Sequence, residues 1–307
     1  MPASRNALAQ LALTFTLTVA LLPALALGAC AGDFEPGSYL ASLRLLGVRA
    51  DLPIAHPGED VALEALFANP EQLPLEWAWA TCTQPSSSTP EACFDALDDG
   101  SRVEGPDLTG HVITIPANIL SDVPQTARDA VFVGVVVALC PGRFVSGDTH
   151  GVPFACEDEA GRLLSLDELQ VGFKRIRVRE EDRNANPVIE GLTWEDESWP
   201  SDFIPEVVPC ERDTFARCPA EQRYELSVAI SEPETGEDEL GSEFEEQQIV
   251  QYYATHGRFE HEVRIGSATA TRWVGIDTLP GDVVTLFAVA RDDRGGLTLT
   301  TRQLRVR

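Results

Sequence analysis

The stretch that decides the fold is residues 282–306, DVVTLFAVARDDRGGLTLTTRQLRV. Its flanks, Asp282–Ala290 and Leu297–Val306, are rich in β-branched and other apolar residues. The six residues between them end in Gly295 and Gly296, which can adopt the positive φ that tight turns need. The pattern therefore predicts a β-hairpin, with strands over 282–290 and 297–306 joined by a turn over 291–296.

Strand patterns continue upstream of this hairpin. Tyr224–Ile230 and Val61–Phe67 alternate apolar and polar residues, as half-buried strands do. Val131–Leu139 is continuously apolar, which predicts a central strand buried on both faces. Further strands are expected over 112–115 and 169–178. The sequence therefore predicts an all-β protein.

The acidic segment near residue 240 is less clear. Helical periodicity is scarce in the chain, and Glu243–Tyr253 is the best helix candidate, although its β-branched and aromatic end is equally compatible with a strand. The overlapping run Glu232–Glu246 contains eight acidic and no basic residues. It is expected to be a solvated loop, the alternatives being a calcium site or a contact for a basic partner.

The polar run 180–187, Glu-Glu-Asp-Arg-Asn-Ala-Asn-Pro, separates two regions of strand patterns. We place an N-terminal domain at residues 38–181, a junction at 182–186 and a C-terminal domain at 187–307. Such a division is expected, because single hydrophobic cores stop growing near the length of this chain.

Both regions resemble a known fold. Residues 187–307, with the terminal hairpin, the Thr278–Gly281 turn and the segment Tyr252–Phe259, resemble an immunoglobulin-like β-sandwich of the polycystic-kidney-disease or cadherin-like kind found in bacterial surface proteins. Residues 40–180, with Pro57-Gly58-Glu59 and two nearby tryptophans, Trp77 and Trp79, are similar to a more distant relative. The resemblance implies two immunoglobulin-like β-sandwich domains in tandem.

The first 30 residues resemble the signal peptide of bacterial lipoproteins. Arg5 supplies positive charge, Ala7–Leu27 is almost wholly apolar, and Leu27-Gly28-Ala29-Cys30 matches the lipobox of that family. The resemblance implies that residues 1–29 are cleaved off as a signal peptide, that Cys30 is lipidated, and that residues 30–37 form the tether.

Two other interpretations of this segment stay open. The 21 apolar residues are long enough for an uncleaved transmembrane anchor, although Pro23 and the small residues before Cys30 argue against one. The second is an ordinary secretory signal with a fortuitous cysteine. For a lipoprotein, Ala31 after the cysteine implies the outer membrane of a bacterium with two membranes, facing the periplasm or the cell surface.

The chain is strongly acidic, with 23 basic and 49 acidic residues and a formal net charge of −26. This balance argues against nucleic acid as a partner, because phosphates require clustered Lys and Arg. It also opposes adsorption to anionic lipid, so the acyl chains are the expected membrane attachment. Lys174 is the only lysine.

Six cysteines remain besides Cys30, and an even number in an exported chain indicates disulfides. They form three close pairs in sequence: Cys82 with Cys93, Cys140 with Cys156, and Cys210 with Cys218. We predict these neighbour pairings. Zinc is the alternative, but the chain contains no Cys-x-x-Cys spacing.

A metal site is considered at the junction. Asp182, Asn184 and Asn186, followed by Pro187, resemble the calcium-binding linker of cadherins. However, Ala185 stands where that family has an aspartate, and partner acidic motifs are missing. A polar turn is therefore the preferred interpretation, and no metal or other cofactor is predicted.

The sequence contains no complete match to the catalytic motifs that we considered. Asp148-Thr149-His150-Gly151 resembles the first motif of metallophosphoesterases, but that family's later motifs are absent from the sequence. There is no Gly-x-Ser-x-Gly elbow and no His-Glu-x-x-His. We expect a non-enzymatic, lipid-anchored envelope protein that binds an unknown protein or glycan partner or acts as a structural module. The alternative is a membrane-anchored hydrolase with an unrecognised site.

Overall fold

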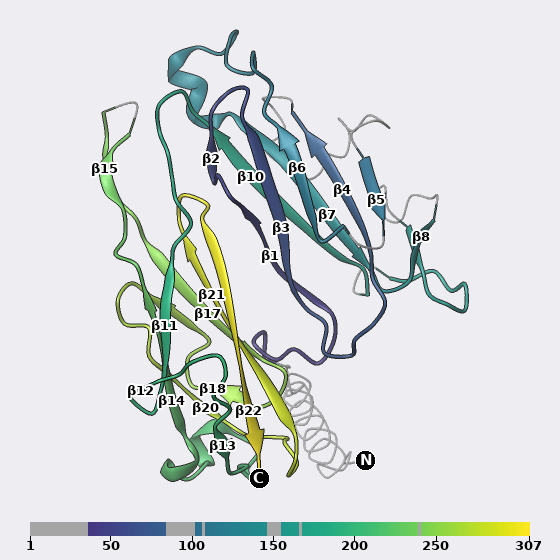
Figure 1. The fold of residues 1–307 in the computed structure, drawn as a ribbon, viewed down its shortest axis with the longest axis vertical. Coiled ribbons are helices and arrows are strands. Elements are labelled where there is room, and N and C mark those ends of the chain that lie inside the picture. The colour runs from purple at the N-terminus through teal and green to yellow at the C-terminus, as the bar shows by residue number, and fades with distance from the viewer. Residues whose placement is uncertain (1–35, 84–101, 106–107, 146–154, 166–167, 239–240) are drawn as a thin grey trace, which may run out of the picture. The chain divides into compact units, whose positions relative to one another are not determined.

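Alternation of buried and exposed side chains gives this chain a nearly all-β structure, as predicted (Figure 1). The computed structural model describes residues 36–83, 102–105, 108–145, 155–165, 168–238 and 241–307. Cys30 and the expected signal peptide, residues 1–29, lie outside these ranges. Within them, no helix has both the length and the apolar character needed to cross a bilayer. The helical elements described are three short 3₁₀ helices, η2 (Gln125–Ala130), η3 (Phe215–Arg217) and η4 (Ala220–Gln222).

The first β-sandwich contains two sheets between residues 44 and 178. The smaller sheet has the order β1 (Arg44–Ala50), β3 (Asp60–Ala68), β6 (Gly110–Thr114). The larger sheet has the order β2 (Ile54–Ala55), β10 (Gln170–Val178), β7 (Phe132–Cys140), β4 (Glu76–Cys82), β5 (Arg102–Gly105). A small hairpin, β8 (Arg143–Val145) with β9 (Ala155–Glu157), follows β7.

The second β-sandwich repeats this plan between residues 189 and 306. One sheet has the order β12 (Glu197–Ser198), β11 (Ile189–Trp194), β14 (Tyr224–Ile230), β20 (Thr271–Val274), β18 (Arg258–Phe259). The other has the order β13 (Glu206–Val207), β22 (Leu297–Val306), β21 (Val283–Asp292), β17 (Gln248–Ala254), β19 (Val263–Ile265).

The strand order identifies both sandwiches as immunoglobulin-like. In each, the first long strand lies in one sheet, and a two-residue strand that follows it pairs in parallel with the last strand of the other sheet: β2 with β10, and β13 with β22. In each sandwich, the last long strand pairs antiparallel with the long strand before it, and that strand pairs antiparallel with the third long strand. These neighbours are β10, β7 and β4 in the first sandwich and β22, β21 and β17 in the second. This arrangement of two sheets is that of the immunoglobulin fold.

Large aromatic side chains fill the two cores. Trp77 and Trp79 of β4 are buried between the sheets of the first sandwich, and the indole Nε1 of Trp79 donates a hydrogen bond to the carbonyl of Leu108 at 2.7 Å. Trp273 and Tyr252 occupy the second core. Each sandwich therefore has a hydrophobic core of its own.

The terminal hairpin forms as predicted. Strand β21 runs to Asp292, two residues beyond the predicted end, and pairs with β22 from Val283↔Arg305 to Arg291↔Leu297. The strands expected over 61–67, 112–115, 131–139, 169–178 and 224–230 are present as β3, β6, β7, β10 and β14.

The helix candidate Glu243–Tyr253 is wrong, and its strand alternative is right. In β17 the residues alternate strictly between buried and partly exposed, as the side chains of a strand do when one face packs on a core. The acidic run 232–246, expected to be a loop, contains the paired strands β15 (Thr235–Glu237) and β16 (Glu243–Glu245).

Candidate functional site

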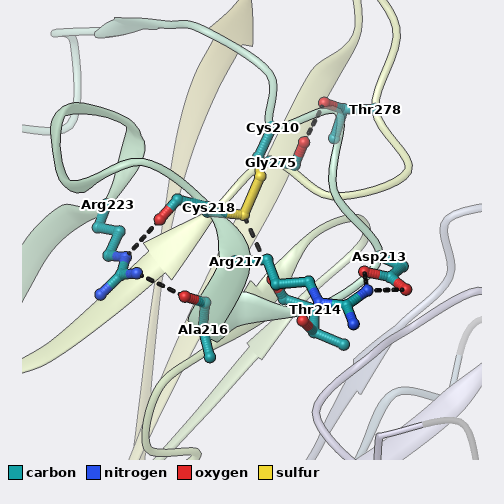
Figure 2. Close-up of a disulfide and its surroundings, with 9 residues drawn as sticks. All are labelled: Cys210, Asp213, Thr214, Ala216, Arg217, Cys218, Arg223, Gly275 and Thr278. Carbon is teal, nitrogen blue, oxygen red and sulfur yellow. Dashed lines mark hydrogen bonds and ion pairs between the residues drawn. A yellow bond between two sulfur atoms is a disulfide. The ribbon is translucent and has the colours of Figure 1, made fainter.

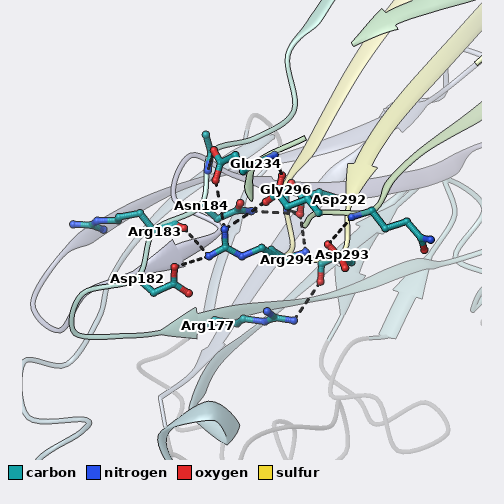
Figure 3. Close-up of polar contacts among 12 residues, drawn as sticks. Arg177, Asp182, Arg183, Asn184, Glu234, Asp292, Asp293, Arg294 and Gly296 are labelled. Carbon is teal, nitrogen blue, oxygen red and sulfur yellow. Dashed lines mark hydrogen bonds and ion pairs between the residues drawn. The ribbon is translucent and has the colours of Figure 1, made fainter. Parts of the chain in front are cut away.

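Buried polar side chains gather where the two sandwiches meet. Residues 179–188, which connect β10 to β11, pass beside the turn between β21 and β22 (Figure 3). Asn184, Asp292 and Arg294 are all buried there. We call this group the Arg294 cluster; its members are Asp182, Asn184, Glu234, Phe244, Glu246, Asp292 and Arg294.

The guanidinium of Arg294 is surrounded by carboxylates. Its Nη2 lies 2.5 Å from Oδ1 of Asp182 and donates to the carbonyl of Arg183 at 2.8 Å. Its Nη1 lies 3.4 Å from Oε2 of Glu234 and 3.6 Å from Oε1 of Glu246. The Arg294 side chain is 9% exposed. A buried charge of this kind is tolerated only while its partners remain in place.

Glu246 is the most buried carboxylate of the cluster, with a side chain that is 3% exposed. Burial raises the pKa of this carboxyl above its ordinary value, and the nearby Asp292 and Glu234 act in the same direction. Oε2 accepts a hydrogen bond from the Glu234 backbone N–H at 3.1 Å. The ring of Phe244 packs against the guanidinium, with its centroid 4.0 Å from Cζ of Arg294.

The turn that carries Arg294 is held by Asp292. Its Oδ1 accepts hydrogen bonds from the backbone N–H groups of Arg294, at 2.9 Å, and Gly296, at 2.7 Å. A Cβ at Gly296 would lie 2.0 Å from Oδ2 of Asp292, so this position requires glycine. Gly295 adopts φ +103°, which also favours glycine.

The side chains of the three calcium candidates all bind other groups of the protein. Asp182 pairs with Arg294, and Nδ2 of Asn184 donates to the Asp292 carboxylate at 3.3 Å. Oδ1 of Asn186 accepts from the backbone N–H of Leu297 at 2.8 Å. Oδ1 of Asn184 is buried without a hydrogen-bond partner, but a single such oxygen is far from the six to eight that calcium prefers. Among the described residues, no group of three or more His, Cys, Asp or Glu is placed to hold a metal ion.

Asn186 also links the two sandwiches. Its Nδ2 donates to the carbonyl of Ala50 at the end of β1 at 2.8 Å, while its Oδ1 holds the start of β22. One amide side chain therefore joins a strand of each sandwich.

An apolar core lies beside these polar contacts, and we call it the junction core. Phe287, Val289 and Leu297 from β21 and β22 are buried in it, at exposures of 8%, 0% and 3%. From the first sandwich it contains Leu46, Leu66 and Ala68, and Leu40 joins it from the segment before β1. The two sandwiches therefore share a packed interface.

The segment before β1 pairs with the second sandwich. Leu40 N–H donates to the carbonyl of Ala254 at 2.8 Å, and Ala254 N–H donates to the carbonyl of Ser38 at 2.9 Å. The Ser38 hydroxyl also donates to Glu262 at 2.7 Å. Residues 38–40, which the sequence assigned to the N-terminal domain, are thus bonded to the end of β17 in the second sandwich.

A cleft of about 310 Å³ opens where β1 and β10 face the turn between β21 and β22. Lys174 of β10 lines it and donates to the carbonyl of Gly295. The pKa of this lysine is lowered to about 8, chiefly by burial; Arg291 and Arg177 also lower it, whereas Asp292 raises it.

A salt bridge beside the junction predicts a dependence of stability on pH. Arg183 holds both carboxylate oxygens of Glu59, at 2.5 and 2.6 Å, and thereby lowers the pKa of that carboxyl from 4.5 to about 2. A lowered pKa gives stability that is complete above the unfolded pKa and is lost as the pH falls toward 2. The melting temperature of Glu59→Gln should therefore lie below that of the wild type at pH 7, and the gap should close between about pH 4.5 and pH 2.

Because the pair is partly exposed, this gap is expected to be small. Glu190→Gln, at an exposed position of β11, is the control and should show no pH-dependent gap. A gap for Glu59→Gln that stays constant down to pH 2 would contradict the assignment.

Two of the three predicted cysteine pairs are disulfides in the structure. Cys140 and Cys156 join the end of β7 to β9, and Cys210 and Cys218 close a short loop before η4 (Figure 2). Cys82 is also disulfide-bonded. The other four described cysteines pair with each other, so the partner of Cys82 lies outside the described residues, as does the predicted partner Cys93.

The loop closed by Cys210 and Cys218 is fixed further by hydrogen bonds. Arg223 donates to the carbonyls of Cys218 and Ala216 at 2.9 Å, and Arg217 pairs with Asp213 (Figure 2). Cys210 N–H donates to the carbonyl of Gly275, which attaches the loop to the end of β20. These contacts give the disulfide a structural role. The phosphoesterase-like motif Asp148–Gly151 lies outside the described residues.

The main functional candidates that the sequence did not reveal are Arg294 and Lys174. Arg294 was assigned to a turn by its neighbouring glycines, and Lys174 to a strand. Both meet their partners across more than 100 residues of chain, such as Asp182 for Arg294 and Gly295 for Lys174. The one sequence feature that could have drawn attention to Lys174 is that it is the only lysine in the chain.

No protein-family model and no curated protein matches this chain. Among solved structures, the Ig1-2 module of the Drosophila receptor protein tyrosine phosphatase DLAR is 9% identical with a TM-score of 0.25, and the match covers 87% of this chain and 99% of that one. The match to the periplasmic chaperone SfaE has 10% identity and a TM-score of 0.22, and covers 38% of this chain and 56% of the chaperone.

A third similarity is to the transglutaminase of red sea bream. It has 10% identity and a TM-score of 0.26, and covers 88% of this chain and 32% of the enzyme. The chain thus spans about half the length of the chaperone and about a third of the enzyme. At TM-scores this low the similarities support no inference about activity or partners, and the fold assignment rests on the strand order itself.

Proposed function

We propose that this chain is a lipid-anchored, non-enzymatic binding module of the bacterial cell envelope, held at the outer membrane through Cys30. The lipobox-like tetrapeptide and the acidic composition support the anchor, because a chain with a net charge of −26 needs a lipid to remain on a membrane. The partner is a protein or a glycan.

One structural observation carries the proposal. The residues that follow the expected tether, Ser38–Leu40, are bonded to the second sandwich at Ala254, and Leu40 lies in the junction core. The tether from Ala31 to Gly37 spans at most roughly 25 Å. Anchoring at Cys30 would therefore hold both sandwiches, and not the first alone, near the bilayer.

Open sheet edges support the binding role. Strand β19 ends one sheet of the second sandwich, and its Val263 and Ile265 side chains are 48% and 56% exposed. An edge strand of this kind presents unpaired backbone groups and apolar side chains to a partner.

Cys30→Ser tests the anchor. The wild-type protein is expected in the membrane fraction at mature size, released by detergent and not by high salt. Because serine offers no thiol for the lipid, the variant should be soluble or remain an unprocessed precursor. Ala31→Ser, which keeps the cysteine and the tetrapeptide, is the matched control and should behave as the wild type.

A Cys30→Ser protein that stays in the membrane at mature size would contradict the anchor. The binding role has a separate test, which is cross-linking in intact cells followed by mass spectrometry. Reproducible cross-links from residues near β19 to one envelope component would support it. Their absence, with cross-links elsewhere on the chain, would place the contact on another surface.

A further inference from the structure

The cleft at the junction is built from both sandwiches. Leu45 and Val48 of β1 and Lys174 of β10 line one side of it, and Arg291, Gly295 and Leu297 line the other. Its volume of about 310 Å³ lies at the small end of the range for ligand pockets. It would hold about ten groups the size of a water molecule.

The cleft carries positive charge in a strongly acidic protein. Lys174 and Arg291 are the two cations that line it, and Asp292 is the one carboxylate among its lining residues. The Asp292 carboxylate already accepts hydrogen bonds from Arg294, Gly296 and Asn184. The positive charge at the cleft therefore exceeds the negative charge that faces it.

The two cations at the cleft have hydrogen-bonding capacity to spare. Lys174 donates to the carbonyl of Gly295, and Arg291 donates through Nη2 to the carbonyl of Leu46. Within the described part of the chain, both donate to backbone oxygens rather than to carboxylates. Nε of Arg291 is buried and has no hydrogen-bond partner among the described residues. A lysine ammonium has three donors and an arginine guanidinium has five, so each of these two side chains has donors left for a ligand.

We propose that this cleft binds a small organic carboxylate, with the carboxylate held by Lys174 and Arg291 and a short apolar chain packed against Leu45, Val48 and Leu297. Cationic donors beside apolar walls are the usual recognition pattern for such an amphiphile. The inference concerns a different surface from β19 and holds whether or not the chain is lipid-anchored.

The single lysine makes the test direct. Purified full-length protein labelled with [13C]lysine gives one side-chain Cε–Hε signal in NMR spectra, and this signal reports the ionisation of Lys174. Hexanoate is the probe, hexanamide is its uncharged analogue, and acetate lacks the longer apolar chain. Hexanoate should shift the signal saturably and raise the pKa of Lys174, because a bound anion favours the ammonium form.

Hexanamide should give no saturable shift, and acetate should bind at least tenfold more weakly than hexanoate. Arg291→Gln keeps the lysine signal and should weaken hexanoate binding at least tenfold. Arg305→Gln, an exposed position of β22, is the matched control and should bind as the wild type does. Melting temperatures of the two variants establish that both are folded.

Three results would overturn the proposal. They are the lack of a saturable shift up to millimolar hexanoate, equal shifts with hexanoate and hexanamide, and unchanged hexanoate binding by folded Arg291→Gln. Equal affinity for acetate and hexanoate would overturn the part that assigns the apolar walls to ligand binding.

Discussion

Replacing Arg294 with methionine is expected to lower the free energy of unfolding by about 3 to 5 kcal/mol, because it removes one partner of a buried ionic group. Methionine fills similar space but leaves Asp182 and Glu246 without their cation, and their side chains are 14% and 3% exposed. Urea denaturation at pH 8 measures the change. The loss should become smaller as the pH is lowered, since burial raises the pKa of Glu246 and protonation of that carboxylate removes one uncompensated charge.

Arg49→Met is the matched control for this experiment. Arg49 pairs with Glu64 across β1 and β3, but both side chains are more than 40% exposed. Solvent screens such a pair, so its loss should change stability much less than the loss of Arg294. If the two variants are destabilised equally, the Arg294 cluster is no more important than an ordinary surface ion pair.

Phe287→Ala is expected to cost about 3 to 5 kcal/mol, as removal of a buried aromatic side chain generally does. Phe287 lies in the junction core between the two sandwiches. The wild type should unfold in one calorimetric transition because both sandwiches share this interface. With the interface weakened, the variant should show two transitions, one for each sandwich.

Val283→Ala is the control on the same strand. Val283 lies four residues earlier on the same face of β21 and is 45% exposed, outside the junction core. It should leave a single transition near the wild-type melting temperature. A single transition for Phe287→Ala at the temperature of the control would show that the two sandwiches are not coupled through this core.

The sequence predicted features that depend on neighbouring residues. The terminal hairpin was accessible because glycines mark its turn and apolar residues mark both strands, and the close cysteine pairs because short loops bring them together. In β17 two periodicities competed within one segment, and only packing against the second core favoured the strand.

The junction could not be predicted in this way. Asp182 was singled out for its oxygens as a calcium candidate, yet its partner Arg294 lies 112 residues away. Neither residue indicates the other, because the contact exists only after both sandwiches have folded. The same holds for Lys174 and Gly295.

The pairing of Ser38–Leu40 with Ala254 has a mechanical consequence for an anchored protein. A pull between the membrane and a bound partner would first load two backbone hydrogen bonds, the Ser38–Glu262 hydrogen bond and the Leu40 side chain. Their rupture would free residues 38–42, because Leu43 is buried in the core of the first sandwich. The linker would lengthen by up to roughly 18 Å while both sandwiches stayed folded. The segment would thus act as a short extensible link that yields before either domain does.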